Sequence, residues 1–239
     1  MKIFRHLIVS LTVLLSLVNN SCERFNCIEG NNIFDSEERL TGNFSGVELD
    51  GYFDVYVNYD TVTSVYVEGD ENLLEFITTY TKGNVLEIGT SSRRCLESGH
   101  PIVITVNTPT LDYLNLAGSG FINCSYFSIP DLDVEIDGSG SIYADVDCNN
   151  LNADIIGSGE IRLTGSCINS YLRIDGSGRI RAFEFDSEVC YVDIYGSGDV
   201  YVFVWDLLDV YIEGSGIVYY EGNPVVKERI EGSGDVTRR

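Results

Sequence analysis

Seven cysteines are the most reactive side chains of this 239-residue sequence, and the first of them stands where a lipid could be attached. Cys22 follows the stretch Asn-Asn-Ser, which comes soon after an apolar run over residues 7–18 and the basic residues Lys2 and Arg5. A basic start, an apolar run too short to cross a bilayer and a small residue before the cysteine are typical of a bacterial lipoprotein signal peptide. We therefore expect residues 1–21 to be removed and Cys22 to carry the acyl chains that anchor the protein in a membrane. A plain signal peptide or an uncleaved anchor is the alternative.

Histidine, carboxylate and metal chemistry has little support in the sequence. His6 lies in the apolar leader and His100 precedes Pro101 in a loop, so a nucleophilic triad would depend on His100 alone. Asp and Glu total 37, too many for any one pair to stand out as glycosidase carboxylates. Asp137 and Asp175 stand beside glycines, but calcium-binding β-rolls use a shorter repeat. We expect no catalytic residue, no metal site and no cofactor.

The net charge of the chain argues against some classes of binding partner. The formal net charge is −22, and removing residues 1–21 would take away Lys2 and Arg5 and no acid, which gives −24. Such an acidic chain does not attract nucleic acid or anionic lipid headgroups by charge. We interpret the acidity mainly as a device that keeps a β-rich surface soluble.

A tripeptide repeat supplies the framework that would position any site. Gly-Ser-Gly recurs at intervals of 20, 19, 19, 20, 18 and 18 residues, and its copies begin at Gly118, Gly138, Gly157, Gly176, Gly196, Gly214 and Gly232. Self-similarity at such a period is typical of a solenoid. Each copy lies between two stretches of alternating apolar and polar residues, which is typical of β-strands. Each repeat is thus predicted to be a strand, a Gly-Ser-Gly corner, a second strand and a turn.

The repeats align residue by residue. Two positions before the first glycine stand Leu116, Ile136, Ile155, Ile174, Ile194, Ile212 and Ile230. The last copy departs from the pattern two positions earlier, where Glu228 replaces an apolar residue. Identical columns favour copies stacked in parallel over a meander of hairpins. The predicted fold is an all-β parallel β-helix with coils of about 19 residues, stacked about 4.8 Å apart around an aliphatic interior.

The corners are predicted to be structural. Both glycines of each corner are expected to adopt dihedral angles that a Cβ would penalise, and stacked corners also need small residues. A phosphate-binding loop is the rival interpretation. Every copy leads into a strand, however, and no P-loop lysine follows it.

The register also sorts the cysteines that follow Cys22. Cys148 and Cys167 both lie eight residues beyond their corner, so they would be stacked neighbours at a distance that a disulfide accepts. We expect Cys124 and Cys190 to be small core residues. Cys27 and Cys95 could pair across the N-terminal region.

Tyrosines provide the candidate binding surface. Tyr201 and Tyr219 share one outward column, and Tyr171 and Tyr191 share another. We interpret these four as an exposed face for a sugar or protein ligand, or as a subunit interface. Phe183 and Phe185 are expected to turn inward, because strict alternation would otherwise bury Glu184.

The N-terminal part is less regular. Residues 22–40 are polar and without a period, so we expect a tether. Residues 41–239 form the β-helix domain, with irregular coils over 41–110 and regular repeats over 111–239. One short helix is predicted after Asp70, which would act as its N-cap, with Leu73, Leu74 and Ile77 on one face.

The stretch from "DGYFDVYVNYD" to "PIVITVNTPTLDYLNLAGSG", followed by the Gly-Ser-Gly copies, resembles the "putative auto-transporter adhesin, head GIN domain" family of exported proteins of Gram-negative bacteria. The resemblance covers about residues 44–236. It implies a right-handed parallel β-helix, often oligomeric, and brings no catalytic residues with it.

Together these features predict a non-enzymatic cell-envelope lipoprotein, lipid-anchored in the outer membrane, whose β-helix is a scaffold for adhesion or for binding a glycan or protein partner. A homo-oligomer is expected as one way of using the exposed face. The alternative function is that of a polysaccharide-active enzyme built on a β-helix.

Overall fold

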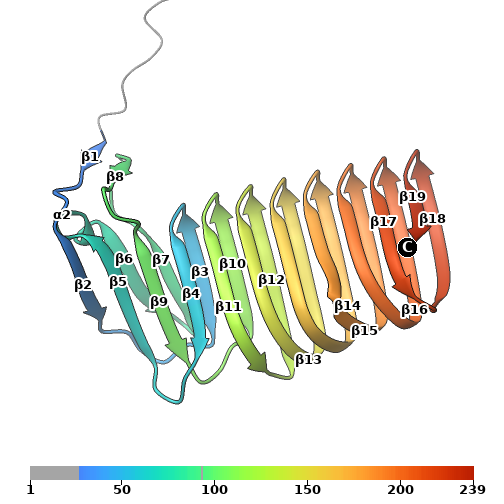
Figure 1. The fold of residues 1–239 in the computed structure, drawn as a ribbon, viewed down its shortest axis with the longest axis horizontal. Coiled ribbons are helices and arrows are strands. Elements are labelled where there is room, and N and C mark those ends of the chain that lie inside the picture. Colours follow the sequence, from blue (N-terminus) through green and yellow to red (C-terminus); the bar gives the residue numbers. More distant parts are fainter. Residues whose placement is uncertain (1–26, 93) are drawn as a thin grey trace, which may run out of the picture.

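The computed structural model describes residues 27–92 and 94–239. These residues form a parallel β-solenoid whose coils stack along the long axis of the molecule (Figure 1). The all-β solenoid with coils of about 19 residues is thereby confirmed. The leader over residues 1–21 and Cys22 lie outside the described residues.

The repeats form strands that pair in register with the next coil. Ile155, Ile174, Ile194 and Ile212, for example, lie opposite one another in successive coils. The strands of the repeat region are β10 (Tyr113–Gly118), β11 (Phe121–Ser128), β12 (Asp131–Gly138), β13 (Ser141–Gly157), β14 (Glu160–Gly176), β15 (Arg179–Gly196), β16 (Asp199–Gly214), β17 (Ile217–Gly222), β18 (Val225–Gly232) and β19 (Asp235–Arg238).

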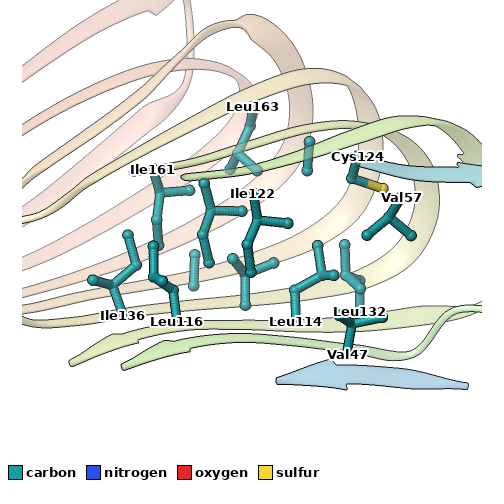
Figure 2. Packing of buried hydrophobic residues seen from close by; sticks show 14 of the residues in the cluster. Val47, Val57, Leu114, Leu116, Ile122, Cys124, Leu132, Ile136, Ile161 and Leu163 are labelled. Carbon is teal, nitrogen blue, oxygen red and sulfur yellow. The ribbon is translucent and has the colours of Figure 1, made fainter. Parts of the chain in front are cut away.

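Each coil contributes one segment to each of two sheets. The segments that precede each Gly-Ser-Gly pair with one another and are called the upstream sheet here, and those that follow it form the downstream sheet. Strands β13 to β16 are long because each continues from the downstream into the upstream sheet. Figure 2 shows the inward side chains of both sheets meeting, with Leu114 and Leu116 from one and Ile122 and Leu163 from the other. All four side chains are buried, so the predicted inward columns form the core.

The two glycines of a corner have different roles. The first, such as Gly176, has φ +134°, and a Cβ there would lie 2.3 Å from the carbonyl oxygen of Gly157 in the previous coil. The second, Gly178, does not have a left-handed φ. It is required for space, because a Cβ would lie 2.7 Å from Ile155. Our expectation that both glycines need unusual dihedral angles is therefore wrong for the second. Between them, Ser177 donates its backbone N–H to Gly157 at 2.8 Å.

The N-terminal region begins with one true coil. Strands β3 (Gly46–Gly51) and β4 (Asp54–Tyr59) pair in parallel with β10 and β11, and Gly51 takes the place of a corner glycine. Strands β7 (Val85–Thr90) and β9 (Val103–Thr108) extend the two sheets in parallel with β3 and β4.

Antiparallel strands then cover this end. Strand β5 (Ser64–Asp70) pairs antiparallel with β9 and with β2 (Phe34–Arg39), and β6 (Ile77–Lys82) pairs antiparallel with β7. The short strands β1 (Ile28–Glu29) and β8 (Leu96–Glu97) pair beside them. The expected irregular coils are found only in part, since β7 and β9 continue the parallel stack whereas β5 and β6 run antiparallel. Residues 34–39 are a strand rather than part of a tether. The edge of β5 that faces away from β9 offers backbone partners, which the polar segment β2 uses without an apolar period.

The predicted helix is a single turn, α2 (Glu71–Leu74), which buries Leu73 and Leu74. Asp70 precedes it, but its side chain makes no capping hydrogen bond. In residues 27–92 and 94–239 no helix has the length and apolar character needed to cross a bilayer.

Candidate functional site

The four predicted tyrosines form two stacked pairs rather than one face. Tyr171 and Tyr191 lie on the upstream sheet with ring centroids 5.0 Å apart and planes 6° apart. Tyr201 and Tyr219 lie on the downstream sheet, 4.9 Å and 17° apart. The register predicted both pairs, but the solenoid core separates them. Tyr171 and Tyr191 are 45% and 37% exposed, whereas Tyr201 and Tyr219 are half-buried.

Tyr201 of the downstream pair borders a hollow of about 350 Å³. Its walls carry three arginines, two carboxylates and two aromatic rings: Arg162, Arg181, Arg239, Glu160, Glu184, Phe183 and Tyr201. The guanidinium of Arg239 lies over the ring of Tyr219 at 4.8 Å and over those of Tyr201 and Phe183 at 5.9 Å each. Such contacts are favourable because the face of an aromatic ring is negative.

A bulge in β15 shapes the hollow. Ala182 pairs with Val202, but the next paired residue, Asp186, lies opposite Phe203, so residues 183–185 have no partner in β16. Bulges of this kind redirect side chains. Phe185 turns into the core as expected, whereas Phe183 turns outward and packs edge-on against Tyr201 at 5.5 Å. The expectation that both phenylalanines face inward is therefore wrong for Phe183.

Ion pairs hold two of the three arginines of the hollow in place. Arg162 contacts Glu184 at 3.3 Å, and Arg181 contacts Glu160 at 3.2 Å. Next to them Arg179 lies 3.7 Å from both Glu160 and Asp199, its neighbours in the stack. All of these side chains are substantially exposed, so the pairs orient the arginines more than they stabilise the fold.

A second cluster lies at the N-terminal end and was missed from the sequence. The buried Asp70 carboxylate accepts hydrogen bonds from the Ser98 hydroxyl at 3.0 Å and from the Gly99 N–H at 2.6 Å, and contacts His100 Nδ1 at 2.6 Å. The hydrogen bond to His100, opposed by burial and reinforced by the other two donors, lowers the pKa of Asp70. These contacts replace the helix cap that we had assigned to Asp70.

The chemistry of this cluster is structural. In a nucleophilic triad the serine bonds to the histidine, and the histidine to the acid. Here Ser98 and His100 both bond to Asp70, so the histidine does not activate the serine. The adjacent hollow, about 270 Å³ and lined in part by Tyr52, Ser98 and His100, is smaller than the downstream one. The signal that could have revealed the cluster is the polar stretch after Cys95, which a disulfide to Cys27 brings to Asp70.

The cysteines are distributed only partly as expected. Cys27 and Cys95 form a disulfide. Cys148 and Cys167 lie opposite each other in register as predicted, but both are free thiols, so the disulfide that this register would allow is not formed. Cys167 turns into the core toward Ser187, whereas Cys148 is half-exposed.

Cys124 and Cys190 are free and buried, as predicted for core residues. Burial raises the pKa of each to about 12, which keeps both as unreactive thiols. No group of three or more His, Cys, Asp or Glu side chains that could hold a metal occurs among the described residues.

Comparisons with known proteins place these features in a family. A family model described as "Putative auto-transporter adhesin, head GIN domain" matches residues 43–224. Two solved structures are similar over their full lengths. A putative adhesin from Bacteroides fragilis has a TM-score of 0.84, 21% identity and 89% of this chain covered. A putative lipid binding protein from Parabacteroides distasonis has a TM-score of 0.76, 25% identity and 90% of this chain covered. A search of curated proteins found no match.

Proposed function

Because the chain belongs to the "putative auto-transporter adhesin, head GIN domain" family, we propose that it is an exported, adhesin-like protein that binds a glycan or protein partner at the cell surface. The observation that carries this proposal is the set of tyrosine rings stacked in register on a rigid solenoid. A repeated backbone fixes these rings, so little side-chain freedom is lost when a ligand binds. A stacked aromatic surface of this kind suits a sugar or a second protein.

Anchoring is part of the same proposal. Cys22 would carry lipid after removal of residues 1–21 and would hold the solenoid by its N-terminal end in the outer membrane. Metabolic labelling with a radioactive fatty acid tests this directly. We expect label in the wild-type protein and none in Cys22→Ala, which should also leave the membrane fraction; equal labelling of both would refute lipidation at Cys22.

The ligand is best sought with residues 23–239, which include every described strand. We expect saturable binding to a glycan array or to intact cells, weakened in one of two double variants, Tyr171→Ser/Tyr191→Ser or Tyr201→Ser/Tyr219→Ser. Because the pairs lie on opposite sheets, each variant is the matched control for the other. Absence of binding to every array and cell type would contradict an adhesive role.

The same protein and its bound glycans also test the alternative function, that of a polysaccharide-active enzyme. Turnover of a bound glycan, followed by the appearance of reducing ends, would favour an enzyme. The arrangement of Ser98, Asp70 and His100 argues only against a serine-nucleophile enzyme such as an esterase, since it lacks the contact between nucleophile and base. The similar structure described as lipid binding suggests a lipid ligand, but charged side chains around the downstream hollow suit a polar one.

A further inference from the structure

The side chains that line the downstream hollow include three arginines and two glutamates, so they carry a net positive charge on an acidic molecule. The net charge is −22, and only 15 residues of the chain are basic, yet Arg162, Arg181 and Arg239 line this one hollow. They come from β14, from β15 and from the residue that follows β19, so three separate segments converge. Such convergence on a strongly acidic background indicates a site for an anionic group.

The arginines retain donors for a ligand. A guanidinium has five N–H donors. Arg162 donates to Glu184, and Arg181 donates through Nε to Glu160. None of the ion pairs among the described residues involves the Arg239 guanidinium, which instead lies over three aromatic rings. A cation–π contact needs no hydrogen-bond acceptor, so the N–H groups of Arg239 remain able to form the two-pronged contact that matches a carboxylate.

The aromatic wall specifies the rest of the ligand. Tyr201 stacks on Tyr219, and Phe183 stands edge-on to Tyr201, so an apolar surface adjoins the charged one. The volume of about 350 Å³ lies at the lower end of the range for small-molecule sites. Glu160 and Glu184 can accept hydrogen bonds from hydroxyl groups. A ligand with a carboxylate, hydroxyls and a flat C–H face satisfies all three requirements.

We propose that this hollow binds a carboxylate-bearing sugar, a uronic or sialic acid residue of an acidic glycan. Arg239, Arg181 and Arg162 receive the carboxylate, and the sugar ring lies beside Tyr201 and Phe183, which line the same hollow. This assignment rests on the proposed adhesin-like function and names its ligand class and its site.

The opposite sheet offers a matched control. There Arg173 also lies over a tyrosine, Tyr195, at 5.0 Å, and near Asp154 at 4.0 Å. It shares the cation–π contact of Arg239, but none of the described hollows includes it. Arg173→Ala therefore removes the same charge and the same kind of contact from outside the site.

The test is titration calorimetry of residues 23–239 with oligogalacturonate, with oligoglucuronate and with a sialylated oligosaccharide, each beside its carboxyl-reduced neutral counterpart. We expect at least one acidic sugar to bind and its neutral counterpart to bind about tenfold more weakly or not at all, as loss of a charged hydrogen bond predicts. Arg239→Ala should weaken binding about tenfold, Arg239→Lys less, and Arg173→Ala should leave it unchanged. Unaltered thermal unfolding of the variants shows that the fold is intact.

Several results would overturn the assignment. Equal binding of the acidic and reduced sugars, equal losses in Arg239→Ala and Arg173→Ala, or tighter binding of sulfated than of carboxylated glycans would each do so. If no carboxylated sugar binds while the array shows a neutral glycan or a protein, this site assignment fails and the adhesin-like function stands. If nothing binds at all, both fail.

Discussion

The two ends of the solenoid solve the problem of an exposed sheet edge in different ways. At the N-terminal end β2 and β6 run antiparallel to their neighbours, and a disulfide and the Asp70 cluster fasten the surrounding loops. At the C-terminal end β18 and β19 continue the parallel stack, and among the described residues each pairs on one side only, as β2 and β6 do at the other end. A further coil would need a parallel strand edge to pair with. The antiparallel strands remove that edge at the N-terminal end, whereas it remains at the C-terminal end.

The C-terminal end is guarded by side chains instead. Glu228 occupies an inward column that is apolar in the other repeats, and Pro224 directly precedes β18. Charges that point inward and prolines near an edge strand are common defences against edge-to-edge association. Core burial is also weaker there, since Val226, Ile230 and Val236 are only partly buried. The N-terminal end is therefore closed by a change of strand direction, and the C-terminal end is protected by the side chains of its edge strand.

The largest effect on stability is expected when a corner glycine is replaced by valine, and we compare a corner in the middle of the stack with the last one. Gly176→Val would place a Cβ 2.3 Å from Gly157 O, and Gly176 also pairs with Gly196 in the following coil. We expect a loss of more than about 4 kcal/mol. Gly232→Val makes a similar clash, 2.2 Å from Gly214 O, but the last coil can detach and limit the cost. Urea denaturation measures both, and equal losses would show that the last coil is not the weaker one.

The next effect concerns the disulfide at the N-terminal end. Cys27 and Cys95 are separated by 68 residues, and the bond limits the freedom of that loop in the unfolded chain. Replacing both by serine should lower the free energy of unfolding by about 2–4 kcal/mol. Hydrogen exchange should rise in β1, β2 and β8 and stay unchanged in β16 to β19. A uniform rise in exchange rates along the chain would mean that the disulfide does not stabilise the N-terminal end separately from the other coils.

A smaller effect of opposite sign is expected at the C-terminal end. Glu228→Val restores the apolar column and should stabilise the last coil by about 1 kcal/mol. It also removes an edge charge, so the protein should self-associate more readily. Analytical ultracentrifugation and hydrogen exchange over residues 225–238 measure the two effects. A variant that is stabilised and still monomeric would show that other groups guard this edge, and Lys227→Val is the control at the neighbouring position.

The smallest effect is expected in the pH dependence of unfolding, because the substitution changes a single carboxylate. The His100 hydrogen bond lowers the pKa of Asp70 below the ordinary 3.8. The unfolded state therefore binds a proton first as the pH falls, and the contribution of Asp70 is complete above pH 3.8 and lost as the pH drops through its lower folded value. Thermal unfolding between pH 7 and pH 2 should show a shallower acid slope for Asp70→Asn. An unchanged slope would assign the acid sensitivity to other carboxylates.

The regular coils could be predicted residue by residue, because each copy states the same columns again. Ile155, Ile174 and Ile194 show both the face and the register, and the tyrosine pairs followed from the same alignment. The N-terminal cover could not be predicted in this way. Its pairs, such as Phe34 with Asp70, join distant segments that share no repeat.

The candidate site was predicted in part for a similar physical reason. Periodicity gives the register of Tyr201 and Tyr219, but it cannot say that a bulge sends Phe183 outward, since a bulge breaks the period. Nor does it bring Arg239 to those rings. Asp70 shows a third limit: its carboxylate could cap a helix or bond to the loop at residues 98–100, and only the three-dimensional structure decides between them.

The serine-to-glycine hydrogen bonds of the corners have a mechanical consequence. Bonds such as that from Ser177 to Gly157 join successive coils, so they point along the axis on which the coils stack. A force applied between the N-terminal end and a ligand held at Arg239 would act along these hydrogen bonds, so the coils would separate one after another. Each opened coil of about 19 residues would release about 60 Å of chain. The solenoid would then lengthen in steps under tension and dissipate energy before the bound ligand dissociates.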